Sequence, residues 1–257
     1  MKSLAVFSYE ITTDPHFFDF GIGQTILNNM AAQNLNMAHI KMDAHERQAA
    51  YFSVCLMKED IMNHVVSSRL YALNVNEEPH AGLNYFSDNY EPISLHLGNL
   101  TTIEKFYQLD QVIVLENPSV FQIVNEFFKN EKLEKVGLVC SSGQINLATY
   151  LLLDKLVASK VKLYYAGDFD AEGLLIAQRI KLKYKASVDL LLYQKEHYLK
   201  ARSKKNMSDV RKASLVNCKI PELKEVAQLI EVHGQWGYQE ALIEDYCMAI
   251  KQMTSYK

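Results

Sequence analysis

The chain has 257 residues, of which 49% are hydrophobic and 22% are charged, and its formal net charge is −3. This composition is typical of a soluble globular protein that can bury a sizeable core. No apolar run approaches the ~20 residues that a membrane span needs, and the N-terminus lacks the pattern of a signal peptide. The four cysteines are scattered without a Cys-x-x-Cys pair. This spacing argues against a zinc site or a disulfide framework and favours a reducing, cytoplasmic location.

The first 108 residues are predicted to form a mostly helical N-terminal region. Apolar residues recur there at helical spacing in two segments. One other stretch is polar, as in a loop, and another alternates between apolar and polar residues, as in a strand. We expect a helix start at 12–19, helices over 21–32 and 44–66, a loop over 73–90 and a strand at 93–97, while residues 4–9 fit either a short strand or an exposed chain start.

From residue 109 to residue 200 the pattern changes to a repeat of buried strands and helices. Four apolar runs follow one another at a spacing of roughly 25 residues, with helical segments between them. Such a repeat predicts an α/β fold with a parallel sheet and right-handed crossovers. No Gly-x-Gly-x-x-Gly or Walker lysine motif follows a strand, which disfavours a dinucleotide or ATP site. The expected strands are 112–115, 136–140, 162–166 and 188–192, and the expected helices are 119–129, 144–158 and 174–184.

Residues 201–257 are predicted to be a C-terminal basic loop followed by helices that pack on the preceding domain. The loop covers 202–212, and the helices cover 221–231 and 238–253. The last helix carries an apolar stripe, which by default packs on the sheet or on a partner subunit.

The most informative stretch is the turn after the third strand of the repeat, where Asp168 and Asp170 follow Gly167. Two neighbouring carboxylates repel each other, and they usually need a cation, a proton or an arginine. An Asp-x-Asp pair is a common way to hold a hard divalent ion such as Mg²⁺. The alternative is a helix N-cap with acid in the first turn, which needs no metal.

Two other strand ends belong to the same edge if the strands are neighbours. Glu116 follows the first strand of the repeat, and Ser141, Ser142 and Gly143 follow the second. Parallel strands place their carboxyl ends on one edge of the sheet, where ligands collect. We therefore expect these residues to converge with the Asp-x-Asp turn.

A glutamate on one strand and an Asp-x-Asp on a later strand resemble the toprim domain, a metal-binding module of topoisomerases, primases and some nucleases. Leu115-Glu116-Asn117-Pro118, Cys140-Ser141-Ser142-Gly143 and Gly167-Asp168-Phe169-Asp170-Ala171-Glu172-Gly173 resemble one branch of it more closely. That branch is the nuclease subunit of Wadjet-type bacterial plasmid-defence systems, which is related to the topoisomerase VI A subunit. Fuller members carry a further N-terminal DNA-binding part, so we expect this chain to be either a short member or truncated.

The resemblance implies a Mg²⁺- or Mn²⁺-dependent DNA endonuclease that hydrolyses phosphodiesters. It implies that Asp168 and Asp170 hold the metal, that Glu116 is a further ligand or a proton carrier, and that Glu172 supports a second metal or caps the helix. Ser141, Ser142 and Gly143 would either bind a phosphate at a helix N-terminus or serve as a plain cap. The expected partners are double-stranded DNA, a second copy in a homodimer and the subunits of a condensin-like ATPase complex, with no membrane. Gln239 and Glu240 could reach the site from the last helix, although a position away from it is favoured.

A basic segment follows the Asp-x-Asp turn. Between Arg179 and Lys212 there are eleven Lys/Arg and three acids, a net +8 in a chain of net −3. A basic surface beside an acidic metal site suggests a polyanionic substrate, although a solvated charged face explains it equally well. Lys204 and Lys205, in its most polar stretch, are the expected DNA contacts.

Two other functions stay open. In a haloacid-dehalogenase-type phosphatase a strand also ends in Asp-x-Asp, but that motif normally opens the domain and Glu116 would be unexplained. A non-catalytic toprim subunit could instead serve only in DNA binding or assembly, although the presence of all three acids disfavours it.

Overall fold

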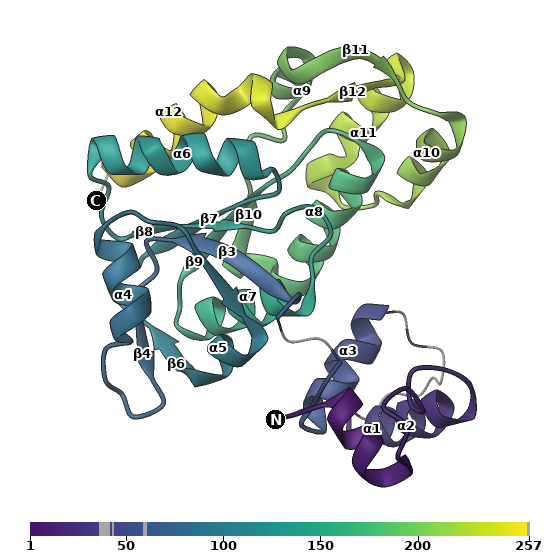
Figure 1. The fold of residues 1–257 in the computed structure, drawn as a ribbon. Helices are drawn as coiled ribbons and strands as arrows, with labels where there is room; N and C mark the ends of the chain where they lie inside the picture. Colours follow the sequence, from purple (N-terminus) through teal and green to yellow (C-terminus); the bar gives the residue numbers. More distant parts are fainter. Residues whose placement is uncertain (36–41, 43, 59–60, 256–257) are drawn as a thin grey trace.

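The computed structural model describes residues 1–35, 42, 44–58 and 61–255. Within these residues, a six-stranded and mostly parallel sheet with helices on both faces confirms the α/β class (Figure 1). Its strand order is β10-β9-β7-β8-β3-β5. The sheet comprises β3 (His64–Ser68), β5 (Ile93–His96), β7 (Gln111–Leu115), β8 (Val136–Cys140), β9 (Lys162–Ala166) and β10 (Val188–Leu190).

The central strand β7 pairs in parallel with β8 on one side and with β9 on the other. Its last residue, Leu115, lies opposite Cys140 and Ala166, the last residues of the two neighbours. Every residue of β7 and β8 is buried, as expected for strands that are covered on both faces. The three strands therefore end side by side on one edge, which is the arrangement that the predicted site requires.

Helices lie on both faces of the sheet. Figure 1 shows α6 and α12 side by side on one face, where Lys251 and Glu131 join them through an ion pair of 2.6 Å. Helix α7 lies on the other face, and the Tyr184 hydroxyl at the end of α8 donates to Asp154 of α7 at 2.8 Å. The helices of this region are α4 (Ala81–Asp88), α5 (Leu97–Thr102), α6 (Pro118–Glu131), α7 (Leu147–Ala158), α8 (Ala171–Tyr184), α9 (Lys195–Ala201), α10 (Asp209–Ser214), α11 (Pro221–His233) and α12 (Ile243–Ser255), with 3-10 turns at Lys185–Ser187, Leu215–Asn217 and Gln239–Leu242.

The N-terminal helices form a smaller core of their own (Figure 1). The buried Tyr51 hydroxyl donates to the Asn28 side chain at 2.7 Å and ties two of these helices together. The helices are α1 (Leu4–Thr12), α2 (Gly21–Asn34) and α3 (Ala44–Ser53), and the short strands β1 (Lys2–Ser3) and β2 (Leu56–Met57) pair beside them.

Several predictions for this first region are wrong. Residues 4–9 are helical, with Leu4 and Ser8 buried on one face, because a short apolar run does not by itself distinguish strand from helix. The helix start expected at 12–19 is instead a turn after α1, which ends at Thr12 and is followed by Thr13 with a left-handed φ of 62°. The helix expected over 44–66 stops at Ser53, and its last residues belong to β3.

Two segments predicted as loops contain regular structure. Residues 73–90 include α4, whose first turn is capped by the His80 ring, which accepts the Leu83 N–H at 3.2 Å. Histidine is not one of the usual capping residues, so the sequence did not indicate that a helix starts here. Residues 202–212 form β11 (Arg202–Asn206) and α10, and β11 pairs with β12 (Gln235–Gly237). The remaining strands of the described residues, β4 (Ala72–Asn74) and β6 (Ile103–Phe106), pair with each other.

The other expected elements are confirmed with shifts of their ends, the largest in the last helix, which begins at Ile243 after a 3-10 turn instead of at 238. A division of the chain at 108 and 200 stays a prediction, although the sheet already takes β3 and β5 from the first region. None of the described helices combines the length and the apolar run that crossing a bilayer requires.

Candidate functional site

Glu116 and Asp168 meet at the carboxyl edge of the sheet, as predicted. Glu116 directly follows β7, and Asp168 follows β9 after one intervening glycine. The Asp168 backbone N–H donates to Glu116 Oε2 at 3.3 Å. The pairing of β7 with β9 thus brings together two acids that are 52 positions apart.

The segment that leads into the last helix completes this edge. The Gln239 N–H donates to Asp168 Oδ1 at 2.9 Å, and Gln239 Oε1 accepts the Asn117 N–H at 3.0 Å. Gln239 is fully buried, and Glu240 Oε1 accepts from the Asn117 side chain at 2.9 Å. The interpretation that Gln239 and Glu240 stay away from the site is therefore wrong.

Asp170 and Glu172 each use one carboxylate oxygen within the chain. Asp170 Oδ1 accepts the Gly173 N–H at 2.6 Å and caps α8, so the helix-cap interpretation holds for this oxygen. Glu172 Oε1 accepts from Gln144 at 2.9 Å, and Gln144 in turn accepts from Arg179 at 3.0 Å. A chain of hydrogen bonds thus leads from the acidic turn to the first residue of the basic segment.

The turn itself needs glycine at position 173. A Cβ atom there would lie 2.4 Å from the carbonyl oxygen of Asp168, a contact that no side chain tolerates. This close approach allows α8 to start directly after the turn that follows β9, with its N-terminus at the carboxylates.

The acids of this edge are destabilised as anions. Burial raises the pKa of Glu116 to about 7, and the neighbouring acids, Asp168 first among them, add to the rise. Burial also raises the pKa of Asp168 to about 6, although the hydrogen bond from Gln239 opposes it. Among the described residues, no lysine, arginine or histidine forms an ion pair with these acids or with Asp170 and Glu172.

The carboxylate oxygens at this edge are ligands that a hard cation accepts, but they do not form a complete coordination shell. As the side chains stand, the described residues contain no group of three Asp, Glu, His or Cys arranged to hold a metal ion. Glu116 is held to the backbone of Asp168, and Asp170 and Glu172 each have an oxygen engaged elsewhere. Mg²⁺ usually takes only one or two protein carboxylates and completes its shell with water and substrate phosphates. The chemistry of the pair fits such an ion.

The Ser141-Ser142-Gly143 segment does not lie at a helix N-terminus. Helix α7 begins only at Leu147 and is capped by the Asn146 side chain. The Ser141 N–H donates to the Leu115 carbonyl at 2.9 Å, and the Gly143 N–H donates to the Glu116 carbonyl at 3.3 Å. These contacts hold the β7 and β8 ends together, and the predicted phosphate role loses the geometry on which it was based.

The basic segment is partly neutralised where it runs along α8 and α9. Lys181, Lys183 and Lys200 on these two helices each form an ion pair with an acid, as does Lys212 on α10. The cations farther along gather around Trp236 of β12, where the Lys205 ammonium lies 5.1 Å and the Arg211 guanidinium 4.6 Å from the ring centre. Lys204 and Lys205 are both exposed on β11, and Lys205 in addition packs against the Trp236 ring.

This basic strand pair is joined to the acidic turn through the backbone. Phe169 and Gly237 exchange two hydrogen bonds, of 2.9 and 3.0 Å, between the Asp-x-Asp turn and β12. Two residues after Gly237, Gln239 donates to Asp168. The position of the cations is thus fixed relative to the carboxylates.

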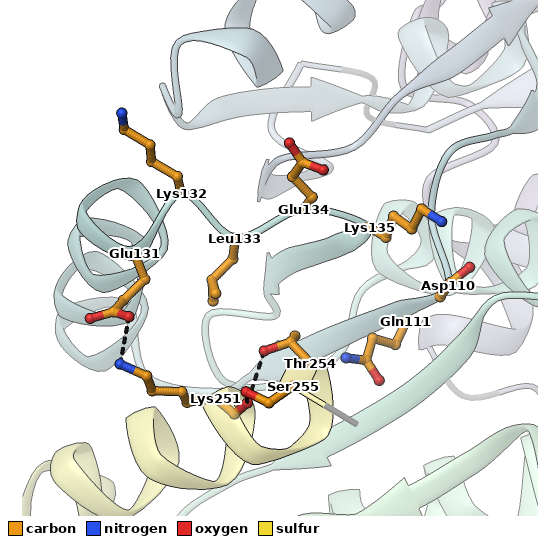
Figure 2. Close-up of a pocket in the computed structure, with 10 residues that line it drawn as sticks. All are labelled: Asp110, Gln111, Glu131, Lys132, Leu133, Glu134, Lys135, Lys251, Thr254 and Ser255. Carbon is orange, nitrogen blue, oxygen red and sulfur yellow. Dashed lines mark hydrogen bonds and ion pairs between the residues drawn. The ribbon is translucent and has the colours of Figure 1, made fainter. Parts of the chain in front are cut away.

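A cavity of about 500 Å³ lies at the opposite, amino-terminal edge of the sheet (Figure 2). Figure 2 shows Asp110 and Gln111, at the start of β7, on one side of it and the Lys251–Glu131 ion pair on the other. None of the predicted site residues lines it. Its charged groups of both signs do not converge on one point, so the carboxyl edge is the better candidate.

Comparison with known proteins places the fold and the site in a family. A search among curated proteins finds no match. Residues 93–249, more than half of the chain, match a family described as "Protein of unknown function C-terminus (DUF2399)". The matched range contains Glu116, the Asp-x-Asp turn and Gln239. The chain is therefore a member of the DUF2399 family.

Proposed function

We propose that this protein is a Mg²⁺- or Mn²⁺-dependent nuclease that hydrolyses phosphodiester bonds of double-stranded DNA. The observation that carries the proposal is that Glu116 accepts the backbone N–H of Asp168 and is destabilised as an anion by the Asp168 charge, while no cation of the described residues forms an ion pair with either acid. Buried like charges need a compensating partner, and perturbed acids of this kind cluster at functional sites.

Glu116 and Asp168 would hold the metal, with the second oxygen of Asp170 as a further ligand. Such an ion would neutralise charge on the scissile phosphate and make a water molecule more acidic. Gln239 fixes the orientation of Asp168 through its N–H, and the Asn117 cap of α6 fixes Gln239 in turn. This support keeps the carboxylate in place before substrate arrives.

The alternative role of Glu116, in place of metal binding, is to carry a proton. Hydrolysis adds a water oxygen to phosphorus, breaks the bond to one sugar oxygen and requires a proton on that leaving oxygen. Burial and neighbouring charge set the pKa of Glu116 to about 7, close to the pH at which it would work. A group with such a pKa exchanges a proton efficiently in both directions.

The basic surface around Trp236 would carry the DNA backbone to this site. Lys204 is exposed, and Lys205 and Arg211 are held against the Trp236 ring. Arginine and lysine contacts to phosphates bind DNA without regard to sequence. Because β12 is hydrogen-bonded to the Asp-x-Asp turn, a duplex bound there would pass close to the carboxylates.

The biological setting rests on the resemblance of the three strand-end motifs to the Wadjet-type nuclease subunits. We propose that the chain acts in defence against plasmid or other foreign DNA, as a homodimer and together with subunits of a condensin-like ATPase complex. The match to DUF2399 is compatible with this role.

The direct test is cleavage of supercoiled plasmid by the purified protein with EDTA, Mg²⁺ or Mn²⁺. We expect nicking or linearisation only with metal, and a loss of at least about 100-fold in Asp168→Asn, which keeps an acceptor for the Gln239 N–H. Asp189→Asn is the matched control, because Asp189 lies on β10 and is paired with Lys162 and Lys181. Equal cleavage by wild type and Asp168→Asn would contradict the proposal.

The same samples separate the alternatives. Hydrolysis of a phosphomonoester without DNA cleavage would favour the phosphatase alternative, with Asp168 as nucleophile. Metal-independent DNA binding without any cleavage would favour a non-catalytic subunit.

A further inference from the structure

Two buried tyrosines surround the glycine that separates β9 from the acidic turn. Tyr165 is 0% exposed and Tyr193 is 4% exposed. A Cβ atom on Gly167 would lie 2.5 Å from Glu116 Oε2, 2.9 Å from the Tyr193 hydroxyl and 3.1 Å from the Tyr165 hydroxyl. The missing side chain of Gly167 therefore lets one carboxylate oxygen and two phenol oxygens approach the same point.

Neither hydroxyl has a hydrogen-bond partner among the described residues. The other buried tyrosines near the sheet differ, since the Tyr184 hydroxyl donates to Asp154 at 2.8 Å and the Tyr198 hydroxyl donates to the Gln235 carbonyl at 3.0 Å. A buried hydroxyl without a partner destabilises a fold, so phenylalanine would suit the core better at both positions. The two tyrosine hydroxyls lie beside the Glu116 carboxylate of the candidate site. We therefore look to that carboxylate for the reason why both hydroxyls are present.

We propose that Tyr165 and Tyr193 are positioning residues that donate hydrogen bonds to Glu116 Oε2 when the site is loaded with metal. The proposal rests on the function proposed above. Hydrogen bonds from neutral hydroxyls to an anionic carboxylate are short and strong, and they would direct the other oxygen of Glu116 toward the ion. Groups that orient a ligand in this way typically change metal affinity by about 10- to 100-fold.

The test is the affinity of the purified protein for Mn²⁺, measured by isothermal titration calorimetry without DNA. We expect Tyr165→Phe and Tyr193→Phe each to bind Mn²⁺ about tenfold more weakly than wild type, and the double variant more weakly still. Tyr184→Phe is the matched control, because it removes a buried hydroxyl far from Glu116, and its affinity should equal that of wild type.

Thermal unfolding of the metal-free variants distinguishes positioning from a structural role. Because the two hydroxyls have no partner in the metal-free protein, Tyr165→Phe and Tyr193→Phe should melt at or above the wild-type temperature, whereas Tyr184→Phe should melt lower. Gly167→Ala, which would displace Glu116 while keeping both hydroxyls, should also weaken Mn²⁺ binding.

The outcomes are distinguishable from failure of the proposed function. Wild-type affinity in both tyrosine variants, with a wild type that binds Mn²⁺ and cuts DNA, would overturn this inference alone. A wild-type protein that binds no Mn²⁺ would overturn the proposed nuclease, and this inference with it.

Discussion

At the residue scale, the acids at the carboxyl edge of the sheet make the stability of the fold depend on pH. An acid whose pKa is higher in the folded protein than in the unfolded chain binds more protons when folded. Its contribution to stability is complete below its unfolded pKa, which is 4.5 for Glu116, and is lost as the pH rises through about 7. Asp168 acts in the same direction at slightly lower pH, because burial raises its pKa to about 6. The charges that face this pair are those of Asp170, Glu172 and Glu240.

We therefore expect the melting temperature of the metal-free protein to fall between pH 5 and pH 8 more steeply in wild type than in Glu116→Gln. The amide cannot ionise, so the variant should be the more stable protein at pH 8 by several degrees, on the order of 1–3 kcal/mol. Differential scanning fluorimetry across this range measures the effect. Glu126→Gln, an exposed change on α6, should follow the wild-type curve. Parallel curves for wild type and Glu116→Gln would mean that Glu116 is not strained.

Some residues of the candidate site could be predicted from the sequence and others could not. Glu116 and Asp168 could be predicted to meet, because parallel strand ends share an edge. Gln239 could not, because its role depends on a turn after β12 that places its N–H at Asp168. Tyr165 looked like any core residue of a strand, and its unpartnered hydroxyl is a property of the packed structure alone.

At the element scale, the start of α8 depends on a glycine. Gly173→Ala would place a methyl group 2.4 Å from the backbone oxygen of Asp168, which cannot move without shifting the carboxylate. We expect a fall in melting temperature of about 5 °C or more and a large loss of cleavage.

Gly82→Ala is the matched control for that change, because its methyl group would meet nothing closer than 3.8 Å in helix α4. Its melting temperature should stay within about 2 °C of wild type. Equal effects of the two substitutions would show that the close approach at Gly173 has no special weight.

A second prediction concerns DNA binding by the strand pair β11–β12. Lys204→Ala should weaken duplex DNA binding at every sequence tested and lower the slope of log K against log salt by about 0.9, the value for one lost phosphate contact. Lys183→Ala is the control, since Lys183 is paired with Asp154 and should leave the slope unchanged. Fluorescence anisotropy over a range of salt concentrations measures both. An unchanged slope in Lys204→Ala would return this surface to a solvated face.

Helices and strands could be predicted from the sequence where burial on both faces requires a continuous apolar run. The strands β7, β8 and β9 are apolar runs that each end at a polar residue or a glycine, so their type followed from the sequence. Residues 44–66 and 73–90 were not, because each combines short elements whose ends depend on turns, such as Cys55 with a left-handed φ of 62°. Such turns arise from tertiary packing and leave little trace in the apolar spacing.

At the scale of the whole molecule, the candidate site draws on three distant parts of the chain. Glu116 comes from the end of β7, the Asp-x-Asp turn from the end of β9, and Gln239 from the segment before α12. All three lie inside the range that matches the DUF2399 family, whereas helices α1 to α3 lie outside it and have a core of their own. The candidate site therefore lies within the matched range and not on the N-terminal helices.

The most direct measurement is the anomalous diffraction of crystals of the protein soaked in Mn²⁺. We expect a peak at the carboxyl edge of the sheet, with oxygens of Glu116 and Asp168 at about 2.1 to 2.2 Å from it, and no such peak in Asp168→Asn crystals. A soaked crystal with no peak at this edge, or with its main peak in the cavity between β7 and α12, would contradict this expectation.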